Sequence, residues 1–280
     1  MRRSILLLAI LFTWAVSALS QENDSLPINH FVTRSTLVGV GYTQILDTYL
    51  SPAEYAGIEG RFLHERMRMT KLFGGRVSTQ SMVQSNLAYT ENRSGSGSEF
   101  AGMVNWTYGL HYHFPINGNL RILVGGLGDG NLGFIYNTRN SNNPAQAKAY
   151  INLTASAMAF YKFRIGRRPF SVRYQVNVPF IGAMFSPGYQ QSYYEIFTLG
   201  NHDKVVRFTS LHNQPSMRQL LTLDIPVGGT TLRVGYLGDY QQSKVNNIRC
   251  HTYSHAFMVG FVKNFYLIQH KDPLRKQLPF

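Results

Sequence analysis

The chain has 280 residues, of which 44% are hydrophobic and 15% charged, and its 27 Lys and Arg outnumber its 14 Asp and Glu to give a formal net charge of +13. Such a balance suits acidic partners, whether nucleic acid, anionic lipid headgroups or lipopolysaccharide phosphates, although surplus cations also serve to solvate turns and rims. The single cysteine, Cys250, excludes an intrachain disulfide.

The N-terminus has the residue order of a cleavable secretory signal, residues 1–20. Two basic residues, an apolar run and two small residues follow one another: Arg2, Arg3, Ile5 to Trp14, Ala18 and Ser20. The apolar run is too short to cross a bilayer comfortably as a helix. We expect cleavage after Ser20 without lipidation. Because export removes the chain from most nucleic acid, we expect no nucleic-acid partner and favour an anionic membrane surface.

After an N-terminal periplasmic extension at 21–30, apolar and polar residues alternate with the period of a β-strand. Weaker alternation occurs near 38–42, 77–89, 120–124, 221–227, 232–236 and 257–261, and clear alternation at 103–114, 149–165 and 170–180. The clear runs reach or exceed the roughly nine to eleven residues that a tilted strand needs to cross a bilayer. The segment 58–69 is charged on both faces and is assigned as a strand because its neighbours require one.

The connections between these strands alternate between short and long. The short ones lie at 74–75, 115–118, 166–169 and 228–229, and the long ones at 47–53, 91–98, 137–147, 186–217 and 243–249. Tight periplasmic turns, longer outer loops and both termini inside are typical of bacterial outer-membrane barrels. We therefore predict an all-β fold, a transmembrane antiparallel up-and-down β-barrel over 31–268 with about ten strands, in a range of roughly eight to twelve.

Several segments of the chain carry a resemblance to a known family. They are 40–42, 46–52, 101–106, 136–140, 143–150, 184–187, 192–197 and 260–266. In these segments the chain resembles an uncharacterised family of secreted Bacteroidales proteins, DUF3316, over nearly the whole mature length. The resemblance implies a Gram-negative cell-envelope protein and supplies no catalytic residues.

The polar faces of the strands supply candidate lumen-lining residues: Asn105, His111, His113, Arg121, Asn152, Arg164, Arg173, Gln175, Asn177, Asp224, Arg233 and Asp239. With about ten strands the interior is narrow, close to the size that side chains can fill. We expect a network of paired charges there, because unpaired buried charges are costly. The alternative is a narrow, cation-rich path for a small anionic solute.

Catalytic and metal-binding patterns are weak. His111 and His113 share one strand face, but no third ligand lies nearby, so we predict no metal site and no cofactor. Ser254 and His255 are the nearest match to a hydrolytic pair, with His251 close by and His202 beside Asp203 on the longest loop. Adjacent residues of a strand point to opposite faces, so Ser254 and His255 cannot easily pair. We assign no catalytic residue.

The segment 186–217 is too aromatic for a floppy loop. Its candidate binding residues are Tyr189, Tyr193, Tyr194 and Phe197. It either folds back as a plug, presents a stacking surface for a glycan or partner protein, or extends two strands beyond the membrane and packs on itself. A basic tail, 269–280, follows the last strand and ends at Phe280. Barrels commonly end their last strand with an aromatic residue that the assembly machinery recognises, and the position of Phe280 beyond that strand leaves this signal open.

These patterns predict a non-enzymatic protein of the cell outer membrane, either a structural or binding protein or a narrow channel. Its expected partners are outer-membrane lipid and lipopolysaccharide, the barrel assembly machinery, and a small anionic solute or glycan. An outer-membrane hydrolase of lipid or peptide, with its site at the rim, is the alternative from another class. A soluble exported β-barrel is the second alternative.

Overall fold

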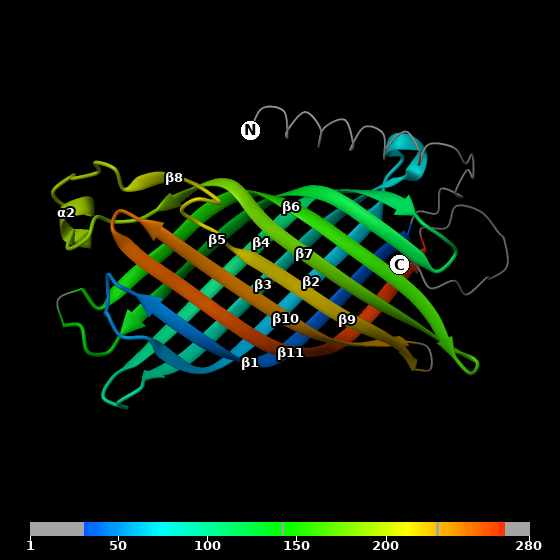
Figure 1. The fold of residues 1–280 in the computed structure, drawn as a ribbon, viewed down its shortest axis with the longest axis horizontal. Helices are drawn as coiled ribbons and strands as arrows, with labels where there is room; N and C mark the ends of the chain where they lie inside the picture. Colours follow the sequence, from blue (N-terminus) through cyan, green and yellow to red (C-terminus); the bar gives the residue numbers. More distant parts are fainter. Residues whose placement is uncertain (1–30, 142, 228–229, 267–280) are drawn as a thin grey trace, which may run out of the picture.

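The computed structural model describes residues 31–141, 143–227 and 230–266. Within them, ten long antiparallel strands close into a barrel (Figure 1). The strands are β1 (Phe31–Asp47), β2 (Tyr55–Met69), β3 (Val77–Asn92), β4 (Ser98–Pro115), β5 (Leu120–Asn137), β6 (Ala145–Ile165), β7 (Arg168–Phe185), β9 (Met217–Val227), β10 (Thr230–Val245) and β11 (Ile248–Tyr266). The predicted fold class is confirmed, and so is the strand over 58–69, which lies in β2.

Each strand pairs with its neighbour along the chain, and two further pairings complete the ring. β11 pairs with β1, where Val259 lies opposite Val38, and β7 pairs directly with β9, where Tyr174 lies opposite Leu221. The short strand β8 (Val206–Ser210) pairs with β7 alone. Helical structure in the described ranges is limited to a short 3-10 helix, η1 (Leu72–Gly75), and one turn of α-helix, α2 (Tyr193–Phe197). No helix in these same ranges is long and apolar enough to cross a membrane.

The two ends of the barrel differ, and we call them the turn end and the loop end. The turn end, at the right of Figure 1, holds η1 and the tight β4–β5 and β6–β7 connections. The loop end, at the left, holds the β1–β2, β3–β4 and β5–β6 connections and the segment 186–216, which carries α2 and β8. The predicted signal (1–20), the extension at 21–30, the turn at 228–229 and the tail (269–280) lie outside the described residues.

One predicted long loop is wrong. The strands β10 and β11 continue through 243–249, with Lys244 opposite Arg249, and only Asn246 and Asn247 form the turn. Both have positive φ, 51° and 62°. Asparagine tolerates this left-handed conformation, and a two-residue turn with positive φ at both positions matches the twist of a hairpin. Asn246 and Asn247 therefore form a tight turn at a place where the sequence had predicted a long loop.

The outward face of the barrel is apolar over its middle. Val40 is 72% exposed, Ile58 71% and Leu87 70%. A soluble barrel would lose free energy by presenting such a band to water, whereas a bilayer solvates it. Aromatic residues flank the band on β4, with Phe100 toward the loop end and Tyr112 toward the turn end. Their separation of twelve positions corresponds to roughly 30 Å along the barrel axis at ordinary rise and tilt. The barrel therefore has the outer surface of a membrane-spanning protein.

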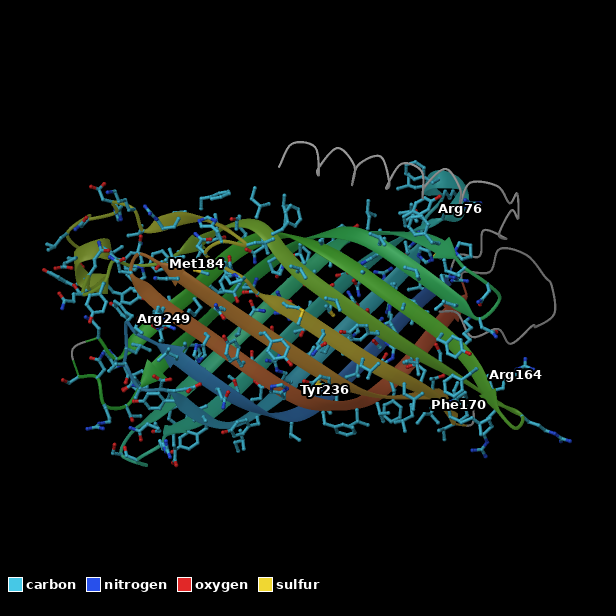
Figure 2. The ribbon with its side chains drawn as sticks, viewed as in Figure 1. Arg76, Arg164, Phe170, Met184, Tyr236 and Arg249 are labelled. Atoms are coloured by element: carbon cyan, nitrogen blue, oxygen red, sulfur yellow. The ribbon has the colours of Figure 1, made fainter. Side chains whose placement is uncertain are left out.

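Contacts between aromatic rings mark the turn-end edge of this band. Tyr112 contacts Phe73 and Phe114, with ring centroids 6.1 Å and 4.8 Å apart, and Phe163 stacks on Phe170 at 5.6 Å. Phe170 and Arg164 lie together at this end in Figure 2. Such aromatic rings prefer the interface between hydrocarbon and headgroups. The turn-end edge of the apolar band therefore has the character of a membrane interface.

The inward face is a packed core. One apolar cluster crosses the lumen from several strands: Leu37, Leu63, Met82, Leu220, Leu237, Ala256 and Met258. A second lies nearer the turn end and consists of Met67, Leu123, Met158 and Phe160. Leu63, Leu123 and Met258 are fully buried. Side chains therefore fill the middle of the lumen, as expected of a small barrel.

Candidate functional site

A network of ion pairs joins opposite walls of the lumen beside these apolar clusters. At its centre, Glu65 of β2 accepts hydrogen bonds from Arg173 of β7 at 2.8 Å and from Arg233 of β10 at 3.2 Å. Gln80 donates to the same carboxylate at 2.6 Å. Arg233 also donates to both oxygens of Asp224, at 2.6 and 2.8 Å. Two carboxylates and two guanidinium groups balance, so this network is electrically neutral.

A second network lies closer to the loop end. Asp239 of β10 pairs with Arg61 at 3.1 Å and with Arg218 at 3.3 Å. Arg61 also donates to Glu59 at 2.6 Å, and Arg218 donates to Asn105 at 2.8 Å. All five side chains are buried. The second network therefore stretches across the lumen as a charged floor.

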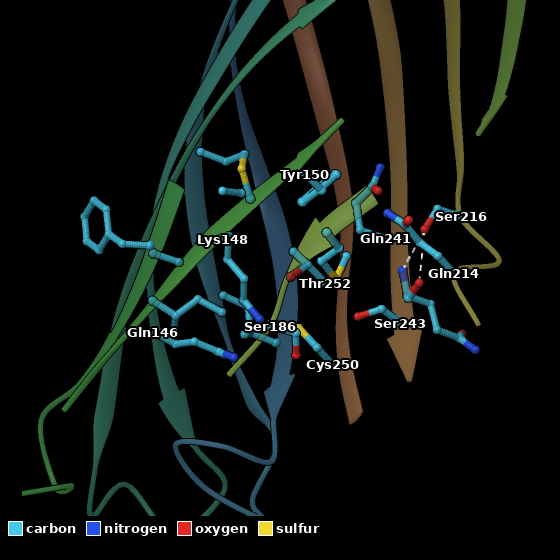
Figure 3. Close-up of a pocket in the computed structure, with 18 of the residues that line it drawn as sticks. Gln146, Lys148, Tyr150, Ser186, Gln214, Ser216, Gln241, Ser243, Cys250 and Thr252 are labelled. Carbon is cyan, nitrogen blue, oxygen red and sulfur yellow. Dashed lines mark hydrogen bonds between the residues drawn. The ribbon is translucent and has the colours of Figure 1, made fainter. Parts of the chain in front are cut away.

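Above this floor lies a cavity of about 80 Å³ (Figure 3). Its volume corresponds to about six water-sized positions. The floor is formed by Arg61, Arg218 and Asp239, and the walls by residues of β1, β3, β4, β5, β6, β7, β10 and β11 and of the segment 186–216. The polar wall residues are Asn86, Gln146, Lys148, Tyr150, Ser186, Gln214, Ser216, Gln241, Gln242, Ser243, Cys250 and Thr252. Most of the uncharged ones can both donate and accept hydrogen bonds.

The charged groups of the cavity are arranged asymmetrically. Lys148 donates to Asp47 at 2.6 Å and lies 3.0 Å from the sulfur of Cys250. Lys148, Arg61 and Arg218 line the cavity, but Asp239 is the one carboxylate among its lining residues. Asp47 and Glu59, which pair with Lys148 and Arg61, do not line it. Three cations and one carboxylate therefore face the cavity directly, while Asp47 and Glu59 balance the charges of Lys148 and Arg61 from outside its lining.

Gln146 offers the cavity an unused hydrogen-bond acceptor. It is 3% exposed, and its Oε1 atom has no hydrogen-bond partner among the described residues. A buried polar atom without a partner costs free energy unless water or a ligand satisfies it. The Oε1 atom of Gln146 is therefore a point at which a donor group of a bound molecule would be stabilised.

The segment 186–216 is ordered over the loop end. Helix α2 begins with a capping box, in which Ser192 accepts from the backbone N–H of Glu195 at 3.2 Å and Glu195 accepts from that of Ser192 at 2.9 Å. Ile196 is 1% exposed and anchors the helix. The Ser192-to-Glu195 spacing is visible in the sequence and indicates a helix start that the prediction of a loop missed.

Two tyrosines attach α2 to the barrel. The backbone N–H of Ala147 donates to the hydroxyl of Tyr193 at 2.7 Å, and Tyr49 donates to the carbonyl of Gln191 at 2.8 Å. Burial raises the pKa of Tyr49 to about 12 and also raises that of Tyr193, so both hydroxyls stay protonated near neutral pH. The Tyr193 ring stacks on Phe197, with centroids 6.1 Å apart.

The β10–β11 turn holds the other side of the segment. The side chain of Asn246 donates to the carbonyl of Ser186 at 2.7 Å and to that of Lys204 at 2.9 Å. Ser216 bonds both backbone groups of Gln242, at 3.0 and 3.2 Å. The segment is therefore fixed at α2, in its middle and at its end.

The structure places the four candidate binding residues of this segment in two groups. Tyr193 is half-buried and structural, since it holds α2 to β6. Tyr189, Tyr194 and Phe197 are exposed, with Phe197 the most open at 69%. They present rings to the outside at the loop end rather than to the cavity.

Most predicted lumen-lining residues do face the interior. Ten are buried: Asn105, His111, His113, Asn152, Arg173, Gln175, Asn177, Asp224, Arg233 and Asp239. Arg121 is half-buried next to Pro115, at the turn-end mouth. Arg164 is exposed at the turn-end edge of the barrel. It keeps the inward parity of β6 but lies one residue from the strand end, beyond the closed part of the barrel (Figure 2).

Several residues of the site were missed in the sequence. Glu59, Arg61 and Glu65 lie in the segment 58–69, whose charges on both faces concealed which face is inward. Lys148 and Arg218 lie at strand ends, where alternation is hard to extend. The buried parity of neighbouring β1 would have assigned the β2 residues correctly once the register was known.

The histidines and serines considered for chemistry are separated. His111 and His113 bond to different hydroxyls, those of Ser156 at 2.9 Å and Ser78 at 2.8 Å. In the described part of the chain, no group of three or more His, Cys, Asp or Glu side chains could hold a metal ion. Ser254 points inward, 2.8 Å from the hydroxyl of Thr43, while His255 points outward and lies 2.6 Å from that of Tyr236. His202 and Asp203 are exposed on the segment 186–216.

The family model described as "Protein of unknown function (DUF3316)" matches residues 4–272. Among curated proteins, none matches the chain significantly. Solved structures with a similar course of the chain include the transport unit of the autotransporter AIDA-I from Escherichia coli, with a TM-score of 0.41, 8% identity and coverage of 85% of this chain and 91% of that one.

Two other similar structures are an outer membrane protease and an outer membrane channel. The outer membrane protease OmpT from Escherichia coli has a TM-score of 0.43 and 6% identity, with coverage of 85% of this chain and 97% of that one. An outer membrane channel from Pseudomonas putida F1 has a TM-score of 0.35 and 7% identity, with coverage of 88% and 99%. At these values the similarity assigns no role to any residue.

Proposed function

The chain belongs to the DUF3316 family, whose description assigns no function, and we propose from its own residues that it is a closed outer-membrane barrel that binds a small anionic, hydroxyl-bearing solute. The cavity beside the segment 186–216 carries this proposal. Its lining combines three cations with one carboxylate and many uncharged hydrogen-bonding groups. An acidic monosaccharide combines the negative charge, the hydroxyls and a size that suits this space.

The outer membrane is the location that agrees with the outward face and with the signal expected at residues 1–20. The loop end would face outward, because barrels of this class keep their short turns in the periplasm. The resemblance to Bacteroidales proteins suggests the kind of envelope. Exposed cations at the loop end, such as Arg93, Arg139 and Arg249, suit the phosphates of lipopolysaccharide.

Binding without catalysis is favoured by the position of the reactive side chains. Ser254 and His255 lie on opposite faces of β11, so the two cannot act as a nucleophile and its base. The exposed rings of Tyr189, Tyr194 and Phe197 offer stacking surfaces for further sugar units outside the cavity. The barrel assembly machinery is the partner that we expect to insert the chain.

Calorimetric titration of the refolded full-length chain with glucuronate, and with glucose as the uncharged counterpart, tests this proposal. We expect glucuronate to bind more tightly. Gln146→Met should weaken the binding of glucuronate about tenfold, because it removes one uncharged hydrogen-bonding side chain from the cavity wall. Gln84→Met is the matched control, because Gln84 is also a buried glutamine with unpartnered side-chain atoms but does not line the cavity. No binding of either sugar, or equal losses in both variants, would contradict the proposal.

A further inference from the structure

A series of hydrogen bonds crosses the outward face of the barrel from β7 to β11. The Tyr174 hydroxyl donates to Oε1 of Gln219 at 2.8 Å, and Nε2 of Gln219 donates to the Tyr240 hydroxyl at 3.3 Å. The hydroxyls of Tyr240 and Tyr236 lie 3.2 Å apart, and that of Tyr236 lies 2.6 Å from Nδ1 of His255. We call these five residues of β7, β9, β10 and β11 the polar chain.

The polar chain lies within the apolar band. Figure 2 shows Tyr236 between Arg249 at the loop end and Phe170 at the turn end. The residues opposite Tyr236 on the two neighbouring strands, Leu221 and Phe257, are apolar and are 43% and 59% exposed. Polar side chains in hydrocarbon are costly unless a partner takes up their hydrogen bonds. The hydrogen bonds along the polar chain therefore compensate its members for this position.

The polar chain ends at a ring nitrogen that has no hydrogen-bond partner among the described residues. Nε2 of Gln219 can only donate, so the Tyr240 hydroxyl accepts from it and donates its own proton to Tyr236. The Tyr236 hydroxyl then donates to Nδ1 of His255, which places the proton of the neutral ring on Nε2. His255 is exposed, and within the described part of the chain nothing accepts from its Nε2. The polar chain therefore presents one N–H donor to the membrane.

A matching acceptor lies on the neighbouring strand. Tyr42 of β1 is directly opposite His255 and 50% exposed, and its hydroxyl likewise has no hydrogen-bond partner in the described ranges. An acyl chain satisfies neither group because it carries no donor or acceptor. A second copy of this face satisfies both, since His255 of each copy can donate to Tyr42 of the other.

The same face is also complementary to itself in shape. In one row of directly opposite residues, Phe257 of β11 lies on one side of Val40 and Gly60 of β2 lies on the other. Nothing lies within 4 Å of a Cβ atom added at Gly60, which lines an outward groove with Val40, Ile58 and Leu87. A two-fold axis brings the projecting ring of each copy toward the hollow of the other. The face therefore has the arrangement that an isologous contact requires.

We propose that two copies of this chain pair in the membrane through this face, with Nε2 of each His255 donating to the Tyr42 hydroxyl of the other copy and each Phe257 ring seated over Gly60 of the other. Side-chain hydrogen bonds join membrane-spanning segments in the same way, because lipid offers polar groups no partner. The inference rests on the membrane placement proposed above and is independent of the cavity.

Sedimentation equilibrium of the full-length chain in density-matched detergent micelles tests the inference, once protease protection has shown that the chain inserts into vesicles. The wild-type chain should sediment as a dimer. Tyr42→Phe should raise the dissociation constant of this dimer about tenfold, because it removes two equivalent hydrogen bonds. Tyr108→Phe is the matched control, because Tyr108 is 51% exposed on the outward face of β4, three strands from β1. It should change the constant less than about twofold.

A second pair of variants tests the fit in shape. Gly60→Leu should fill the hollow that receives Phe257 and shift the chain to the monomer. Gly126→Leu on β5 is the control, because nothing lies within 4 Å of a Cβ atom added at Gly126 either. Since both glycines leave room for a side chain, both variants should fold, which the heat-induced shift in gel mobility checks.

Three results would overturn the inference: a wild-type chain that stays monomeric at every concentration, an assembly larger than a dimer, or equal effects of variant and control in either pair. Insertion into vesicles separates these results from failure of the membrane placement. A chain that inserts but stays monomeric contradicts the contact alone, whereas a chain that does not insert contradicts the placement as well.

Discussion

Arg173 of β7 reaches across the lumen to Glu65 of β2, and one of its guanidinium nitrogens lies 2.8 Å from each carboxylate oxygen. Both side chains are buried. The pair connects opposite walls of the barrel, so it constrains the cross-section in a way that neighbouring-strand hydrogen bonds do not. Because both charges are buried, removing one partner would leave the other charge without part of its compensation, at a large cost in the free energy of folding.

Removal of Arg173 should destabilise the barrel strongly. Arg173→Met leaves Glu65 with Arg233 as its remaining ion-pair partner in the described part of the chain, and breaking a buried pair from one side costs about 3 kcal/mol or more. Urea unfolding in lipid vesicles measures the change in the free energy of unfolding. Arg167→Met, at an exposed turn, is the control and should change it by less than about 0.5 kcal/mol. Equal effects of the two variants would show that the pair across the lumen contributes no stability.

Closure of the barrel depends on close backbone approach at Gly260. A Cβ atom there would collide with the carbonyl oxygen of Thr36 and lie 2.7 Å from Cα of Leu37 across the β1–β11 seam. Gly260→Ala should therefore weaken the seam and abolish or lower the temperature of the heat-induced shift in gel mobility. Gly126→Ala on β5 is the control, because nothing lies within 4 Å of the added methyl group. If Gly260→Ala changes the heat-induced shift no more than Gly126→Ala does, that result would contradict the close approach of β1 and β11.

The apolar band should not tolerate charge. Val40 lies near the middle of β1 and is 72% exposed. Val40→Arg should cost about 2–4 kcal/mol if this face lies near the bilayer midplane. Leu199→Arg tests a residue of similar exposure, 64%, on the loop-end segment and should be nearly neutral. The measurement is the free energy of unfolding of each variant in lipid vesicles. If Val40→Arg leaves this free energy unchanged, the face that carries Val40 lies in water.

The segment 186–216 should loosen when the Asn246 side chain is removed. Asn246→Gly keeps the positive φ of the turn but deletes the hydrogen bonds to the carbonyls of Ser186 and Lys204. Trypsin should then cut after Lys204 or Arg207 several-fold faster. Asn247→Gly is the control, because Asn247 has the same kind of backbone conformation in the same turn. Unchanged cleavage in Asn246→Gly would show that the turn does not hold the segment.

The sequence was sufficient to predict the barrel, because side chains in β4, β6 and β7 alternate over lengths that a soluble strand rarely needs. It was insufficient for β2, where cations such as Arg66 face the membrane interface while Glu65 faces the lumen, so polarity does not distinguish the faces. The cavity was beyond prediction for another reason. Gln146, Gln214 and Cys250 meet only through the register and closure of the sheet, which alternation does not specify.

Conductance across a planar bilayer, recorded with the full-length chain after its insertion has been established by protease protection, tests the central claim most directly. The filled lumen, with apolar clusters at Leu63 and Leu123 and ion pairs at Glu65 and Asp239, predicts no steady ion current. If the inserted protein shows a steady, reproducible single-channel conductance, the lumen is open, and that result would contradict the filled lumen described above.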